Sequence, residues 1–278
     1  MMINQFQSKP IKPCSMKQLL AAILLTSTLA CNNSAGDAKK TSNSSSEKEQ
    51  QSSGDKAEAA GACSKLIFFS KGAEIEATSY NGEGKEISKQ ITKVLEVRME
   101  DGMTVADVEG TNKGTNDDTK ILHYSYKCDG NNIYFDVASL FRTETKNKDM
   151  DFESSLISYP LNVKEGENLP DMTGTMNSER NGRKMQMKYH YKDRKVEGKE
   201  AVTTPAGTWN CYRISNTIEI DMDIPGMDER AKKMMEAMKE KMKTTAITWL
   251  APDFGIVKME MYMGGKLTSK NEVTAIKK

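Results

Sequence analysis

The fold of this chain is first apparent in Leu122-His123-Tyr124-Ser125-Tyr126-Lys127-Cys128-Asp129-Gly130. Apolar and polar residues alternate along this stretch, and a period of two is typical of a strand with one buried face. The Asp-Gly pair that follows favours a hairpin turn, because glycine adopts positive φ with little strain. The alternation then resumes at Ile133, Phe135 and Val137. The sequence therefore predicts an antiparallel hairpin here.

The same alternation recurs in at least three further segments. Their predicted buried faces are Met185, Met187, Tyr189 and Tyr191; Tyr212, Ile214, Ile218, Ile220 and Met222; and Val257, Met259, Met261 and Met263. Asn81-Gly82 and Gly264-Gly265 predict further turns. Serial one-sided strands indicate a sheet with one wet and one dry face. We expect a mainly β fold, an antiparallel barrel or half-barrel with one amphipathic helix.

The predicted helix runs from Asp228 to Lys243, after the helix breaker Pro225-Gly226. Acidic residues at its start and lysines at its end suit the helix dipole. Its apolar residues fall on one stripe at helical spacing, namely Ala231, Met234, Met235, Met238 and Met242. We expect this stripe to cover the dry face or the mouth of the sheet.

The first 30 residues are predicted to be a lipoprotein signal peptide. Basic residues precede a short apolar run from Leu19 to Leu25, which is too short to span a bilayer. Leu29-Ala30 stands directly before Cys31, the predicted lipidation site. An ordinary secretory signal is the alternative. Met16-Lys17 could also begin a complete signal, in which case the true start would be Met16.

Residues 31–61 then predict a lipidated cysteine and a disordered linker. The segment from Asn32 to Gly61 is rich in Ser, Lys, Glu and Ala and has no aromatic residue, so it buries too little apolar surface to fold. Residues 62–278 are expected to form a single β-rich domain, held to a membrane through Cys31. Lys and Arg number 40 against 39 Asp and Glu, so no basic field for nucleic acid is expected.

Three cysteines follow the linker: Cys63, Cys128 and Cys211. The cell envelope permits disulfides, and Cys63 with Cys128 is the favoured pair. Three free buried thiols are the alternative. No Cys-x-x-Cys is present, which argues against a thioredoxin-like role.

We find no catalytic or metal-binding set in the sequence. Its two histidines, His123 and His190, lie on polar strand faces with no ligand-like partners nearby in the sequence. Asp253-Phe254-Gly255 matches a kinase motif but lacks every accompanying element. We expect a protein that is not an enzyme and holds no cofactor.

The 19 methionines leave three interpretations open. Met thioethers can bind Cu(I), and they can simply fill a core. They can also line a pocket for a lipid or another apolar molecule. The expected pocket residues are Met185, Met187, Tyr189, Ile218, Met235, Met238, Met259 and Met261.

Two segments resemble a known family. Val196 to Ile214 contains Thr204-Pro205-Ala206-Gly207 before Trp209, and Trp249 to Lys258 contains an Ala-Pro-Asp-Phe-Gly connection. They resemble the TapB-like family of Bacteroidota envelope proteins, a β-rich family whose function is largely uncharacterised. The likeness extends over about residues 62–278. It implies a β-rich fold and supplies no catalytic residues.

The sequence thus predicts a non-enzymatic, lipid-anchored envelope protein that binds an apolar ligand or a partner protein. The alternatives are a structural lipoprotein without a ligand, a Cu(I) protein and an enzyme of unrecognised type. We expect an outer-membrane location facing the periplasm, because Cys31 is followed by Asn32 and no surface-export cluster is evident.

Overall fold

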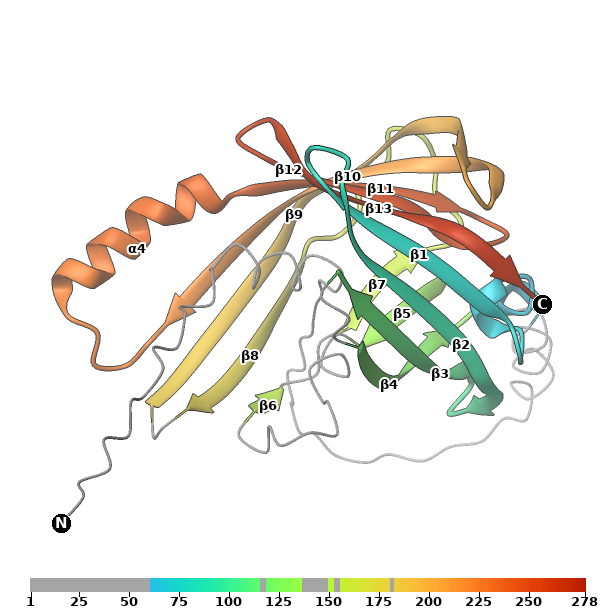
Figure 1. The fold of residues 1–278 in the computed structure, drawn as a ribbon, viewed down its shortest axis with the longest axis horizontal. Coiled ribbons are helices and arrows are strands. Elements are labelled where there is room, and N and C mark those ends of the chain that lie inside the picture. Colours follow the sequence, from blue (N-terminus) through green and yellow to red (C-terminus); the bar gives the residue numbers. More distant parts are fainter. Residues whose placement is uncertain (1–60, 116–118, 137–149, 153–155, 181–182) are drawn as a thin grey trace, which may run out of the picture.

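A computed structural model describes residues 61–115, 119–136, 150–152, 156–180 and 183–278 (Figure 1). The predicted signal peptide, the lipidation site Cys31 and nearly all of the linker lie outside the described residues, as does Val137.

The described residues form one antiparallel sheet of thirteen strands, in the order β6-β8-β9-β10-β11-β12-β13-β1-β2-β3-β4-β5-β7. A short 3₁₀ helix η1 precedes the sheet, and the helix α4 lies between β10 and β11. The bounds are η1 Ile67–Phe69, β1 Glu74–Asn81, β2 Glu86–Glu100, β3 Met103–Gly114, β4 Thr119–Cys128, β5 Asn132–Asp136, β6 Met150–Phe152, β7 Leu156–Pro160, β8 Met172–Arg180, β9 Arg183–Thr204, β10 Gly207–Asp223, α4 Glu229–Met242, β11 Thr244–Ala251, β12 Gly255–Met263 and β13 Lys266–Lys277.

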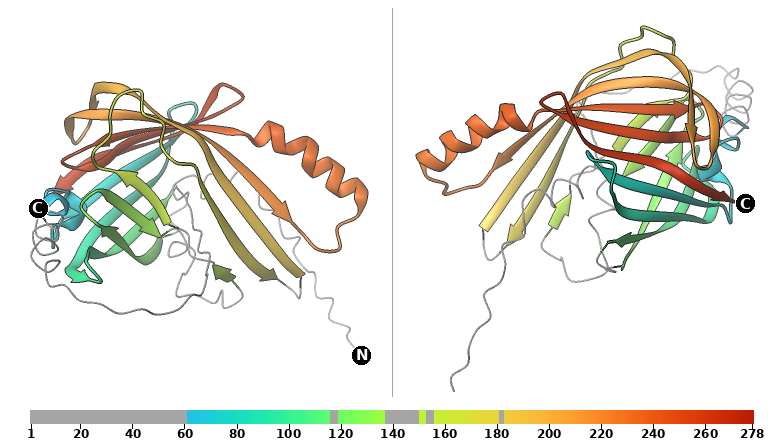
Figure 2. Two further views of the ribbon diagram at one scale, coloured as in Figure 1. Left: turned by 180° about the vertical axis from the view of Figure 1, so that it is seen from behind. Right: turned by 45° about the horizontal axis from the view of Figure 1, so that its top comes forward.

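The sheet curls into a nearly closed barrel, which confirms the predicted fold class (Figures 1 and 2). Register shifts help to explain the curvature, because each bulge bends its strand and increases the local twist. Such shifts occur in β2 between Val94 and Glu96, in β10 between Arg213 and Ile214, and in β11 between Trp249 and Leu250.

The predicted turns are present. Gly264 and Gly265 have φ values of 56° and 75° and join β12 to β13 as a two-residue hairpin. Asn81 caps the β1–β2 turn, since its side-chain oxygen accepts hydrogen bonds from the backbone N–H groups of Glu83 and Lys85. Gly207 pairs with Thr204, so Pro205 and Ala206 form the tip of the β9–β10 hairpin.

The dry face of the sheet forms the core of the barrel. In β4, Tyr124 and Cys128 are buried, whereas His123 is exposed. Tyr189 and Tyr191 of β9 are likewise buried on the inner face, and so is Ile218 of β10. The period-two pattern therefore assigned the faces of these strands correctly.

The helix α4 forms within one residue of the predicted bounds, but its position differs from the prediction. Asp228 caps it, because its carboxylate accepts a hydrogen bond from the Ala231 N–H at 2.8 Å. The helix lies beside the end of β10 and extends away from the barrel, not over its mouth (Figures 1 and 2). The reason is that β10 continues to Asp223, whereas its pairing with β11 ends at Ile218, so the helix occupies the vacated edge.

Candidate functional site

The chain enters the barrel through a short segment that is tied to the sheet by a disulfide. Cys63 and Cys128 are joined with Cα atoms 5.9 Å apart, which is the pairing that the sequence favoured. Cys63 and Leu66 are fully buried, so the segment is anchored by packing as well as by the covalent bond. It lies at one end of the barrel, where η1 follows directly (Figure 1).

Phe68 of η1 projects from this segment against aromatic residues of the sheet. Its ring centroid lies 4.8 Å from that of Tyr126 and 6.1 Å from that of Phe254. It also lies against Gly255, where an added Cβ would come within 2.9 Å of the Phe68 ring. Because Gly255 has a φ of 114° as well, this position is restricted to glycine by both space and conformation.

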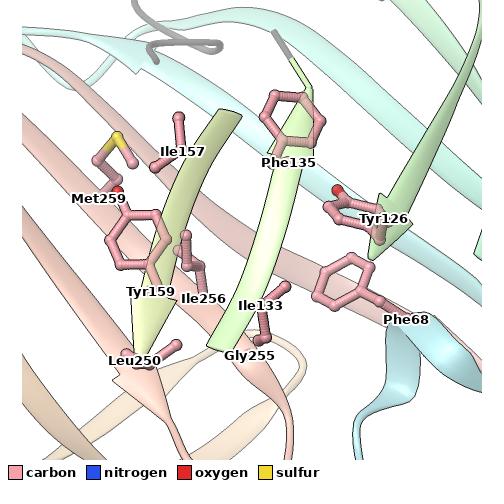
Figure 3. A pocket seen from close by; sticks show the side chains of 10 residues that line it. All are labelled: Phe68, Tyr126, Ile133, Phe135, Ile157, Tyr159, Leu250, Gly255, Ile256 and Met259. Atoms are coloured by element: carbon pink, nitrogen blue, oxygen red, sulfur yellow. The ribbon is translucent and has the colours of Figure 1, made fainter. Parts of the chain in front are cut away.

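Phe68 is one wall of an apolar cavity of about 120 Å³ (Figure 3). The buried part of its lining consists of Ile133, Ile157, Tyr159, Leu250 and Gly255. The half-buried part, which forms the rim, consists of Phe68, Tyr126, Phe135, Ile256 and Met259. Strands β4, β5, β7, β11 and β12 all contribute, so the cavity depends on the closure of the barrel.

The cavity is electrically neutral. None of its lining residues carries a charge, and its side-chain oxygens are the phenol groups of Tyr126 and Tyr159. Burial raises the pKa of Tyr126 well above its ordinary value, and the neighbouring Tyr124 raises it further. Burial also raises the pKa of Tyr159, opposed in part by the nearby Arg194. Both phenols are therefore protonated at neutral pH.

Arg194 joins the two sides of the barrel beside this cavity. The residue is only 3% exposed, and burial lowers the pKa of its guanidinium. Its two terminal nitrogens donate to the carbonyl oxygens of Ser158 and Pro170, at 2.8 and 2.9 Å. Since Ser158 belongs to β7 and Arg194 to β9, the guanidinium bridges the two ends of the sheet. Its carbon also lies 5.8 Å from the ring centroid of Tyr159.

The structure disperses the residues of the predicted methionine-lined pocket over several elements, so this cavity differs from the pocket that the sequence predicted. Only Met259 lines the cavity; Met187, Tyr189, Ile218 and Met261 are buried in the core elsewhere, Met235 and Met238 are half-buried on α4, and the side chain of Met185 is not described. The period-two pattern identified inward-facing residues, but it could not tell which of them a neighbour would cover. The cavity is lined mainly by Phe, Tyr and Ile side chains, several of them from the hairpin around Cys128.

The same dispersal argues against a Cu(I) site shared by the two methionine-containing strands. Strands β9 and β12 are separated by β10 and β11 in the sheet. Three strand spacings correspond to roughly 14 Å along the sheet, which is at the limit of what two Met side chains can span to one metal ion. A site built from other ligands is a separate matter: within the described residues, no cluster of three or more His, Cys, Asp or Glu side chains is arranged to hold a metal.

The outer face around α4 is an ionic network. Lys239 and Lys243 pair with Asp221 and Glu219 of β10, at 2.5 and 3.4 Å. His190 of β9 lies 3.2 Å from Asp221, so this histidine belongs to the network that attaches the helix. A polar groove of about 290 Å³ lies between α4 and the end of β10, and Met235 contributes to it.

Among the described residues, the cysteine outside the disulfide is Cys211, and its thiol is buried. Cys211 is free and 0% exposed, and burial raises its pKa to about 11. At neutral pH it is a protonated thiol packed in the core, which does not suit a nucleophile. No helix in the described part of the chain has the length and apolar content needed to cross a membrane.

A comparison with protein families matches residues 70–273 to the DUF3108-like family. The chain belongs to this family. The match begins just after η1 and ends within β13, so it covers nearly all of the DUF3108-like sheet and the strands that line the cavity. Phe68 and Cys63 lie just before the matched region. A search of curated proteins finds no match.

Two solved structures share the fold of this DUF3108-like chain. A candidate exported protein with a YmcC-like fold from Bacteroides fragilis is 21% identical, with a TM-score of 0.56, over 77% of this chain and 100% of its own. A candidate lipoprotein from Parabacteroides distasonis is 19% identical, with a TM-score of 0.55, over 76% and 99%. The hypothetical lipoprotein YmcC from Escherichia coli is 8% identical over 83% and 97%, with a TM-score of 0.32.

Proposed function

We propose that this protein is a non-enzymatic, lipid-anchored envelope protein that binds an apolar ligand in the cavity beside Phe68. The observation that carries the proposal is the cavity itself. It is a neutral space of about 120 Å³ that opens at a rim of half-buried side chains. An apolar molecule gains free energy on leaving water for such a site, whereas a charged one would lose its hydration without compensation.

Three observations support the envelope location. The signal-like residues 1–30 end before Cys31, and the Cys63–Cys128 disulfide suits an oxidising compartment. The solved structures of similar fold include a candidate exported protein and a candidate lipoprotein. We therefore propose lipidation at Cys31, attachment to the outer membrane on its periplasmic face, and a narrower affiliation with TapB-like proteins.

The chemistry of the site favours binding over catalysis. A catalytic group needs a proton acceptor or a nucleophile at the reacting atom. The cavity presents two protonated phenols and otherwise hydrocarbon, together with one thioether. Binding therefore accounts for the site without a reaction.

Binding of a partner protein is a second candidate function, which a different observation favours. Ile91 of β2 and Ile121 of β4 are 39% and 53% exposed. Both pair in register with Thr111 of β3, so the three residues form a row across one face of the sheet. The two exposed isoleucines flank the half-buried Thr111, and apolar side chains gathered on one face are a feature of protein interfaces.

The proposal is tested by expressing residues 62–278 without the anchor in a bacterial periplasm and recording native mass spectra. We expect a stoichiometric extra mass that extracts into organic solvent. Ile256→Trp, which places an indole at the cavity rim, should remove this mass. Ile247→Trp is the matched control, because Ile247 is half-buried on the other face of the adjacent strand β11.

A bare mass for the wild-type domain, with no uptake of an added apolar dye such as N-phenylnaphthylamine, would eliminate ligand binding. Cross-linking to a protein partner that is lost when Ile91 and Ile121 are both replaced by Ser would then favour the partner-binding alternative.

A further inference from the structure

We propose that the cavity takes the apolar end of a single hydrocarbon chain, about five carbons long, and leaves the polar head of the molecule outside. This inference rests on the proposed function and specifies its ligand class. It follows from the charge, the size and the shape of the cavity.

The charge of the lining decides where the head of the ligand lies. The ten lining residues contain no Lys, Arg, His, Asp or Glu. The guanidinium of Arg194, near Tyr159, already donates to the carbonyl oxygens of Ser158 and Pro170. A charged head therefore has no ionic partner inside, and the phenols of Tyr126 and Tyr159 already face Tyr124 and Thr248, so the head stays beyond the rim.

The size of the cavity decides how much of the chain enters. An apolar protein cavity of about 150 Å³ holds one benzene molecule, which has six carbons. By the same measure, a cavity of about 120 Å³ has room for about five carbons. This is far less than a whole lipid, so the ligand is recognised by the end of one chain.

The shape of the site suits a chain. Tyr159 and Met259 lie at one end of the lining, and Phe68 and Tyr126 lie at the other (Figure 3). Strands β5 and β7 run between them and supply Ile133 and Ile157 to the wall. The space between the two ends is thus bordered by branched aliphatic side chains, and the narrow end of a molecule fits it better than a fused ring system does.

The test measures affinity as a function of chain length. The protein is the full chain carrying Cys31→Ser, which removes the lipidation site and keeps the protein free of its own acyl groups. The probes are alkyl maltosides with three to ten carbons, used below their micelle concentrations. They compete with N-phenylnaphthylamine, a dye whose single phenyl ring is the part small enough to enter the cavity. We expect affinity to rise about fourfold for each added methylene up to about five carbons, and then to level off.

Two controls make the result specific to this cavity. Alkyl sulfobetaines should give the same length dependence within about threefold, because the lining offers nothing to distinguish the heads. Ile256→Trp should reduce the affinity for long chains at least tenfold, whereas Ile247→Trp should not change it. Each variant is first required to unfold cooperatively at the temperature of the parent, within a few degrees.

The failures of the two proposals are distinguishable. If the dye binds and Ile256→Trp removes that binding, but chain length has no effect on displacement, the chain-end inference is overturned and ligand binding stands. A fourfold gain per methylene that continues to ten carbons would also overturn it. If neither the dye nor any chain binds, the proposed function itself fails.

Discussion

Loss of the Cys63–Cys128 disulfide should destabilise the protein substantially. The bond closes a loop with a sequence separation of 65 residues. In the chain-entropy treatment, opening a loop of this length increases the conformational entropy of the unfolded state. The free energy of unfolding falls by about 4 kcal/mol at 25 °C as a result. The two cysteines are 0% and 1% exposed, so their replacement by Ala also leaves a cavity, but only one the size of two sulfur atoms.

The double variant Cys63→Ala/Cys128→Ala is compared with the parent by urea unfolding. With an m value of roughly 2–3 kcal/mol/M, the midpoint should fall by about 1.3–2 M. In a thermal scan, a domain of this size should lose about 8–16 °C. The native state also loses the bond that positions η1, so dye binding at Phe68 should weaken in the same variant.

Cys211→Ala is the matched control, since Cys211 is equally buried and has no disulfide partner. It should cost only about 1 kcal/mol, the usual value for a small change in a core. If the double variant loses no more stability than this control, the loop-closure reasoning is refuted.

Three further predictions concern groups near the site and the turns. Arg194→Leu should lower the unfolding free energy by about 2–6 kcal/mol, because the carbonyl groups of Ser158 and Pro170 lose their donor. Arg98→Leu, on an exposed face, should change stability little, and equal losses in urea melts would contradict the role given to Arg194. The Cys211 thiol, with its pKa raised by burial to about 11, should react with a disulfide reagent at pH 8 only after unfolding, and prompt reaction of the native protein would argue against its burial. Burial alone would raise the pKa of Asp129, but hydrogen bonds from the Tyr134 hydroxyl and from the backbone of Asn131 and Asn132 lower this pKa below its ordinary value. The ionised carboxylate therefore stabilises the fold above the unfolded pKa, and this stability is lost as the pH falls through the folded pKa. Asp129→Asn should reduce the dependence of stability on pH below about pH 4, and an unchanged dependence there would refute this assignment.

The fold was accessible from the sequence because local patterns dictate it. Alternation around Tyr124 and Tyr189 gave the strand faces, and Gly264-Gly265 gave its hairpin without knowledge of the rest of the chain. The start of α4 followed from Asp228, whose capping bond is local. The family match to residues 70–273 is to the DUF3108-like family, and the narrower TapB-like resemblance stays a prediction.

The cavity was not accessible in the same way, because it depends on contacts between distant segments. Phe68 meets Gly255 only after the barrel closes, and no local pattern links the two. The position of α4 also depends on distant contacts. Its apolar stripe predicted a helix that covers the sheet, but β10 extends beyond its pairing with β11, and α4 lies along that extension, away from the barrel. Met187 and Met261 were predicted to line the pocket, but both fill the core outside the cavity lining, a role for which methionine is well suited.

Methyl NMR during titration with a small neutral hydrocarbon tests the central claim most directly. The account predicts that pentane binds one molecule per chain and shifts the methyl signals of Ile133, Ile157, Leu250 and Ile256, which line the cavity. The methyl signals of Ile75 and Ile214, which are buried in the core outside the cavity lining, should not move. No saturable shift at the cavity methyls, or equal shifts at both sets, would contradict a specific apolar ligand site in this protein.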